Sequence, residues 1–121
     1  MNTLQQYEDF RGTENYYEFE DGYAYTDAIN WLKTQLPEQM FYILLVYITN
    51  KMSYKLPFGF FSLHITDDPI GEIYVITTDG DGNTLNKYIL CFKKDLPDFK
   101  LDNGIYRIWC QNYVIFGASE Y

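Results

Sequence analysis

The hydrophobic pattern of this chain changes its period once, and that change constrains the fold more than any other feature. From Thr26 to Met52, apolar residues recur at the three- and four-residue spacing of a helix. After Pro57, apolar and polar residues alternate, as they do in strands that bury one face. Helices followed by strands predict an α+β fold, in which one or two N-terminal helices pack on one face of an antiparallel sheet of about five strands.

The helical region is predicted to span residues 25–52. Thr26 or Asp27 suits the cap of a first helix, which should end near Gln35 because the following proline disfavours helical backbone in the residue before it. The next stretch, 36–52, has helical spacing but also the β-branched and aromatic side chains of a buried strand. Its length of roughly 15 residues favours a central core helix.

The sheet is predicted to span residues 57–117. In its first strand, Phe61, Leu63 and Ile65 are expected to share one face. Turn signals predict one hairpin around 79–83 and another around 111–112. The whole chain, residues 1–121, has a length that suits a single domain.

Charge is concentrated in an acidic, tyrosine-rich head, residues 1–24, which shows no clean period and is interpreted as an extended arm or as short strand and turn pieces. The chain has 17 acidic and 9 basic residues, a net charge of −8, and residues 1–30 hold seven acids against Arg11 alone, or −6. Such a surface repels nucleic acid and steers a basic protein toward it. The alternative is that the charge serves solubility and the rings pack the head onto the domain.

Seven residues of the head are predicted to contact a protein partner. They combine carboxylates, which would meet lysine and arginine side chains, with aromatic rings, which would fill pockets on the partner. The predicted contacts are Glu14, Tyr16, Tyr17, Glu18, Glu20, Asp21 and Tyr23. The head is therefore expected to contribute more to binding than any other stretch.

The two cysteines, Cys91 and Cys110, each lie in an apolar run, which predicts buried, reduced thiols. A disulfide between neighbouring strands is the less favoured alternative. Reduced thiols fit a cytoplasmic protein. No apolar stretch approaches the roughly 18 residues of a membrane helix, and the first residues lack the basic and apolar parts of a secretory signal. No membrane association is expected.

No residue pattern indicates catalysis, a metal or a cofactor. The segment DGDGN, residues 79–83, begins like a calcium loop, but Thr84 replaces the glycine at its sixth position and Leu90 the glutamate at its twelfth. A plain hairpin turn is the favoured interpretation. The single histidine, His64, is expected to be partly exposed on a strand face. The chain is therefore predicted not to be an enzyme.

The segment LPEQMFYILLVY resembles the start of the SUKH superfamily, whose members are largely bacterial immunity proteins. The matching positions are Leu36, Pro37, Glu38, Met40, Ile43, Leu44 and Tyr47. The turn at 79–83 and the closing GIYRIW are similar to parts of that family's sheet. The Asn-Gly that usually ends the family's helix is missing at 48–50, and the acidic head is not part of the pattern. The resemblance implies an α+β fold that binds a cognate toxin tightly and has no catalytic residues.

These observations predict a protein that inhibits a basic protein partner by occlusion. The favoured function is that of an immunity protein that neutralises a toxin or nuclease. The alternative is a phage-encoded anti-defence inhibitor, of anti-CRISPR or DNA-mimic type, that blocks a nucleic-acid-binding protein of the host. A charge of −8 is low for a DNA mimic. A third class is a structural or adaptor domain that uses its tyrosines for assembly.

Overall fold

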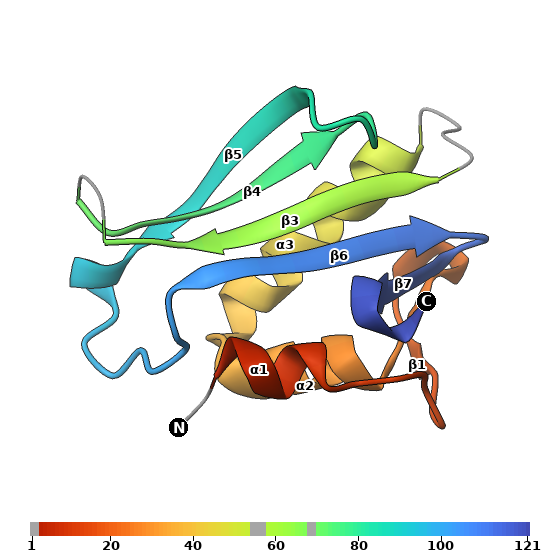
Figure 1. The fold of residues 1–121 in the computed structure, drawn as a ribbon, viewed down its shortest axis with the longest axis horizontal. Helices are drawn as coiled ribbons and strands as arrows, with labels where there is room; N and C mark the ends of the chain where they lie inside the picture. The colour runs from red at the N-terminus through yellow and green to blue at the C-terminus, as the bar shows by residue number, and fades with distance from the viewer. Residues whose placement is uncertain (1–2, 54–57, 68–69) are drawn as a thin grey trace.

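The computed structural model describes residues 3–53, 58–67 and 70–121, and these form an α+β fold (Figure 1). Three α-helices accompany one mixed sheet whose seven strands lie in the order β1-β2-β7-β6-β3-β4-β5. The helices are α1 (Leu4–Glu8), α2 (Asp27–Gln35) and α3 (Glu38–Met52). The strands are β1 (Tyr17–Glu18), β2 (Ala24–Tyr25), β3 (Gly59–Ile65), β4 (Glu72–Thr78), β5 (Thr84–Phe92), β6 (Gly104–Gln111) and β7 (Val114–Gly117).

The helical region confirms the prediction from spacing. Helix α2 begins after Thr26 and ends at Gln35, where Leu36 turns to extended backbone ahead of the proline. The ambiguous stretch forms α3, which buries one side, including the fully buried Leu44 and Leu45. Its other side exposes Glu38, Gln39, Tyr42 and Asn50. In the part of the chain that the structure describes, no helix is both long and apolar enough to cross a bilayer.

The long strands also follow the predicted alternation. In β3, Phe61, Leu63 and Ile65 are buried, and in β4 every second residue is buried. The turn 79–83 joins β4 to β5, and a tight turn joins β6 to β7 with Asn112 and Tyr113 at φ of 53° and 64°. Pro57, the predicted start of the sheet, lies outside the described residues, as do residues 1 and 2 of the head.

The sheet has more strands than the predicted five, because the head and the first residue of the predicted helical region, Tyr25, contribute two of them. Strands β1 and β2 pair with each other, and β2 pairs in parallel with β7, so the sheet is mixed rather than purely antiparallel. The head also begins with a short helix, α1, which the sequence pattern did not reveal. Two-residue strands and a five-residue helix are too short to show a hydrophobic period.

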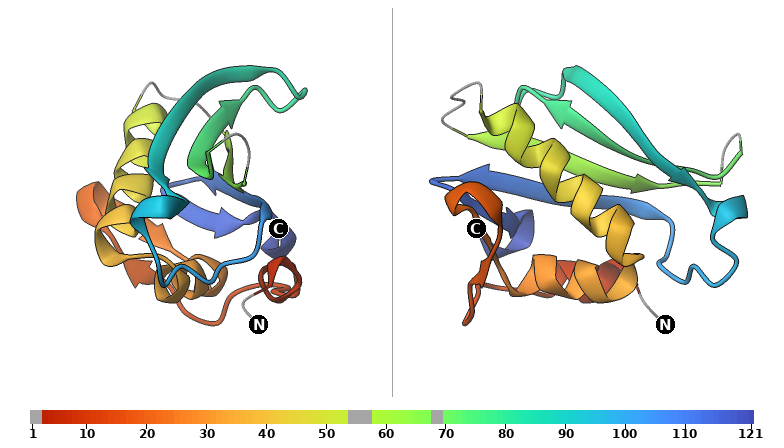
Figure 2. Two further views of the ribbon diagram at one scale, coloured as in Figure 1. Left: turned by 90° about the vertical axis from the view of Figure 1, so that its left-hand side faces the viewer. Right: turned by 180° about the vertical axis from the view of Figure 1, so that it is seen from behind.

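The sheet is covered by long helices on one face only. Helices α2 and α3 lie on that face, as the side and rear views show (Figure 2), and α3 packs against β3 and β5. The core lies between these layers. Among the described residues, no helix packs over the central strands on the opposite face, which faces the viewer in Figure 1.

Candidate functional site

A groove separates the acidic head from the two long helices. It encloses about 470 Å³. The residues that line it are Glu18, Phe19, Tyr25, Lys33, Glu38, Gln39, Phe41 and Tyr42. Two of the seven predicted contact residues flank this groove closely: Glu18 lines it, and Glu20 is hydrogen-bonded to the lining residue Tyr42.

Asp27 fixes the loop of the head that precedes β1. Its carboxylate accepts hydrogen bonds from the backbone N–H of Glu14 at 2.8 Å, from the N–H of Asn15 at 3.3 Å and from the hydroxyl of Tyr17 at 3.0 Å. In return, the N–H of Asp27 donates to the hydroxyl oxygen of Thr13. The Glu14 N–H, above all, lowers the pKa of Asp27. A segment without regular structure is thus held by the first residue of α2.

Two of the predicted contact tyrosines are half-buried and packed within the molecule. The ring of Tyr17 stacks on that of Tyr25, with centroids 5.3 Å apart. Tyr23 packs against Tyr113, with centroids 5.0 Å apart, and it also lies against the hydrophobic core. Both rings therefore help to hold β1 and β2 in place.

The other five predicted contact residues are exposed: Glu14, Tyr16, Glu18, Glu20 and Asp21. Tyr16 exposes 64% of its surface. The ion pairs found among the described residues are Lys87 with Glu72 and Lys93 with Asp67, so none neutralises an acid of the head. The negative charges of these exposed carboxylates are therefore not neutralised by any of those ion pairs.

One residue of this surface was missed by sequence reasoning. The hydroxyl of Tyr42, on α3, donates to both carboxylate oxygens of Glu20, at 2.7 and 2.9 Å, and its ring tilts against Phe19. Tyr42 exposes 47% of its surface. Tyr42 lies three and four residues after Gln39 and Glu38, on the polar side of α3, so helical spacing was the signal that could have placed this ring outside the core. We call Glu14, Tyr16, Glu18, Glu20, Asp21 and Tyr42 the head surface.

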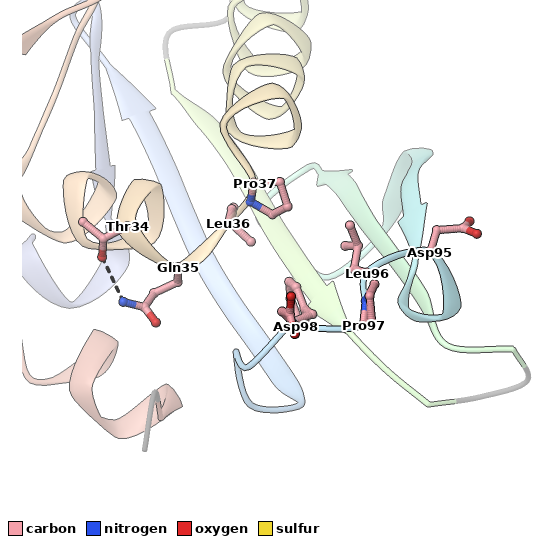
Figure 3. Close-up of a pocket in the computed structure, with 9 residues that line it drawn as sticks. Thr34, Gln35, Leu36, Pro37, Asp95, Leu96, Pro97 and Asp98 are labelled. Carbon is pink, nitrogen blue, oxygen red and sulfur yellow. Dashed lines mark hydrogen bonds between the residues drawn. The ribbon is translucent and has the colours of Figure 1, made fainter.

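A second groove lies at the corner between α2 and α3 (Figure 3). It encloses about 360 Å³ between the residues 34–37 and the segment 95–99. The hydroxyl of Thr34 accepts a hydrogen bond from the amide of Gln35, and the carboxylate of Asp95 points away from the helix corner. This groove brings together no nucleophile and base, and it offers a matched acidic surface for control experiments.

The nearest approach to catalytic geometry lies on β3. The hydroxyl of Ser62 is hydrogen-bonded to Nε2 of His64 at 2.9 Å, and His64 is partly exposed, as predicted. Burial, followed by the cations Arg107 and Lys87, lowers the pKa of His64. No carboxylate among the described residues is recorded as orienting the ring, so the pair lacks the third member of a hydrolytic triad.

No metal site is formed by the described residues. They contain no group of three histidine, cysteine, aspartate or glutamate side chains placed to hold an ion. In the turn 79–83, the carboxylate of Asp79 accepts hydrogen bonds from the N–H groups of Asp81 and Asn83 and from the amide of Asn83. The acid that resembled a calcium ligand therefore closes the hairpin.

The prediction of two buried thiols is correct for one cysteine and wrong for the other. Cys110 is fully buried, whereas Cys91 is half-buried, because it lies on β5, an edge strand with a neighbour on one side only. Both are free. Strands β3 and β4 separate β5 from β6, a spacing of roughly 14 Å, which exceeds the reach of a disulfide.

The two thiols are expected to react at different rates with a water-soluble alkylating reagent. Burial raises the pKa of Cys110 to about 12, so its reactive thiolate is scarce at pH 8. Mass spectrometry of the native protein should find Cys91 modified well before Cys110. Unfolding in denaturant serves as the control and should equalise the rates. Equal labelling of both cysteines in the native protein would contradict this assignment.

The similarity of the segment beginning at Leu36 to the SUKH superfamily stays a prediction. It covers about a quarter of the chain, mainly α3 and parts of the sheet. No family model, no curated protein and no solved structure matches this chain.

Proposed function

We propose that this chain is a non-enzymatic inhibitor that binds a basic protein through the head surface. The observation that carries this proposal is a set of exposed carboxylates, none in an ion pair recorded among the described residues, beside the exposed rings of Tyr16 and Tyr42. Carboxylates of this kind attract a partner and orient its approach, and tyrosine rings provide contact area once it has docked.

Some residues of the head hold it in place while others are exposed, and this arrangement supports binding by a preformed surface. Asp27 and Tyr17 hold the loop and β1 in place, so the exposed acids need little ordering when a partner arrives. Glu18 and Glu20 flank a groove that a lysine or arginine side chain of the partner would enter. If the partner's lysine and arginine side chains are paired with these carboxylates, they cannot bind the partner's own anionic substrate.

The class of inhibitor that fits best is an immunity protein that acts in the cytoplasm on a toxin or nuclease. The SUKH-like segment and the acidic surface both favour it. The alternative is a phage-encoded inhibitor of a host nucleic-acid-binding protein. The acids cluster on the head rather than along an extended face, which favours the immunity protein over a DNA mimic. Neither function needs a cofactor.

Charge reversal on the head surface tests this proposal. The double variant Glu18→Lys, Asp21→Lys should slow association with a basic protein encoded beside this gene by about tenfold or more at low salt, because surface charge acts mainly on encounter. Stopped-flow measurements over a range of salt concentrations should also show a weaker salt dependence. Protection of growth from the toxin should fall in parallel.

A matched variant controls for overall charge. Asp95→Lys, Asp98→Lys makes the same change in net charge at the groove between α2 and α3, whose lining contains no residue of the head surface. It should retain most of the association rate. If both double variants lose the same rate, only the net charge matters and the head surface is not the interface. If neither loses rate, binding to this partner does not use surface charge, which would also contradict the proposal.

A further inference from the structure

The uncovered face of the sheet carries a cluster of aromatic rings. One row across strands β7, β6 and β3 consists of Phe116, Trp109 and Phe60, and the next row, across β6, β3 and β4, consists of Arg107, Ser62 and Ile76. Trp109 packs edge-on against Phe58 and Phe60, with centroids 5.5 and 5.6 Å apart. Directly opposed residues of neighbouring strands share a face, so these rings and the Arg107 side chain lie together.

A hollow of about 340 Å³ opens in this face at Ser62. Ser62 is the small residue between Phe60 and His64 on one face of β3, and the Cα atoms of those two neighbours lie roughly 13 Å apart along the strand. Phe60 and Trp109 form one wall, and His64, stacked on Tyr74 at 4.7 Å, forms the other. Ser62 itself is buried and its hydroxyl is hydrogen-bonded to Nε2 of His64 at 2.9 Å, so the open space lies beside Ser62. The volume of the hollow is large enough for one aromatic ring.

The charged side chain that lines the hollow, Arg107, is a cation, although the chain as a whole is acidic. Arg107 is exposed, lines the hollow and takes part in no ion pair recorded among the described residues. The nearby cation Lys87 is paired with Glu72 at 3.2 Å and lies 4.2 Å above the ring of Tyr74. The charged groups that shift the pKa of His64 are both cations. Arg107 is therefore the group that can pair with a carboxylate at the hollow.

The turn 79–83 completes the rim and carries the carboxylates of Asp79 and Asp81, whose negative charges weaken that attraction, so a bound carboxylate depends on direct pairing with Arg107. It presents Gly80 and Gly82 to the hollow, and Gly80 lies so close to the ring of Phe60 that an added Cβ would approach within 2.7 Å. The carboxylate of Asp79 is occupied by hydrogen bonds within the turn. Glycine here keeps the entrance open and the Phe60 wall in place.

We infer that the hollow binds a partner polypeptide through an acidic residue next to an aromatic residue. The carboxylate pairs with the guanidinium of Arg107, whose fork of donors matches two carboxylate oxygens. The ring enters the hollow beside Ser62, next to Phe60 and Trp109, where edge-to-face contacts are available. This interface is separate from the head surface, which takes cations, and it does not depend on the proposed function.

The peptide acetyl-Gly-Glu-Phe-Gly-amide is a direct probe of this inference. Titrated into the full chain, it should shift the indole N–H signal of Trp109 in a ¹H–¹⁵N spectrum saturably, with a dissociation constant of about 1 mM or tighter. Trp109→Phe assigns that signal. The same peptide with glutamine for glutamate, or with alanine for phenylalanine, should bind about tenfold more weakly, because each lacks one half of the recognition.

Variants of the protein test the same two contacts, the pairing of the carboxylate with Arg107 and the entry of the ring into the hollow. Arg107→Gln should weaken binding of the probe by about tenfold, whereas Lys100→Gln, the same charge change at an exposed lysine, should leave it within about twofold. Ser62→Leu should abolish binding by filling the hollow, with a melting curve to show that the variant is folded.

Three results would overturn the inference: equal binding of the glutamate and glutamine peptides, an unchanged affinity in Arg107→Gln, or NMR signal shifts at residues of the head surface instead of Trp109. If the signals of the sheet face change with protein concentration before any peptide is added, a second copy occupies the hollow and the choice of partner is wrong. Because the probe is anionic, its failure leaves the test of the head surface with a basic partner unaffected.

Discussion

Replacing Tyr7 by alanine is expected to lower the free energy of unfolding by about 3 to 5 kcal/mol, the cost of removing a large buried aromatic side chain. Tyr7 is the one buried residue of α1, with 2% of its surface exposed. Its ring packs edge-on against Tyr106 at 5.5 Å, and its hydroxyl donates to the carbonyl of Arg107 at 2.6 Å. Denaturant unfolding followed by circular dichroism measures the loss.

Tyr7→Phe separates the two contributions. It keeps the ring and removes the hydroxyl, so the carbonyl of Arg107 loses a partner and the expected cost falls to about 1 to 2 kcal/mol. A loss below about 1 kcal/mol for the alanine variant would show that α1 does not dock as described, since a residue packed against β6 and α2 cannot be removed so cheaply.

Replacing Tyr16 by alanine is expected to weaken binding of the basic partner by about 2 kcal/mol or more, roughly 30-fold, mainly through faster dissociation. Tyr16 is the most exposed aromatic ring of the head and makes no ring contact among the described residues. Its removal should therefore leave the melting temperature unchanged. Surface plasmon resonance and thermal melting on the same variant measure both quantities.

Tyr17→Ala is the matched control, one residue along the same segment. It removes the stack on Tyr25 and the hydrogen bond to Asp27, so stability should fall and affinity should change only as far as the head loosens. If the Tyr16 variant keeps its affinity within about threefold, roughly 0.7 kcal/mol, the head serves as scaffold and the interface lies elsewhere.

The parts of the fold that the sequence predicts are those with a hydrophobic period. Helix α2, helix α3 and strands β3 and β4 are long enough for their spacing to be read directly. The head is different, because β2 joins the rest of the sheet through its pairing with β7, and α1 is held by Tyr7 against a distant strand. Local sequence contains no trace of partners that lie about 90 residues away.

The candidate site, too, was predictable only in part. Its acidic, tyrosine-rich composition locates the head, but the exposure of each tyrosine side chain depends on whether its ring packs against another ring in the folded chain. Tyr16 and Tyr17 are adjacent in sequence, yet only Tyr17 meets Tyr25. The hollow at Ser62 was missed altogether, because its lining comes from strands that are far apart in the chain and its depth depends on a small residue between two large ones.

The parallel pairing of β2 with β7 has a consequence for the order in which the protein folds. It joins Ala24 to Val114, and the carboxylate of Glu120 accepts a hydrogen bond from Thr26 across a similar span. Closing a loop of 90 residues costs about 4 kcal/mol of chain entropy beyond a constant, whereas β3, β4 and β5 pair with sequence neighbours. We expect the head to dock late and to detach first. A partner bound to the head would then stabilise its docked state. It would slow the earliest step of unfolding and protect the segment that proteases would otherwise cleave first.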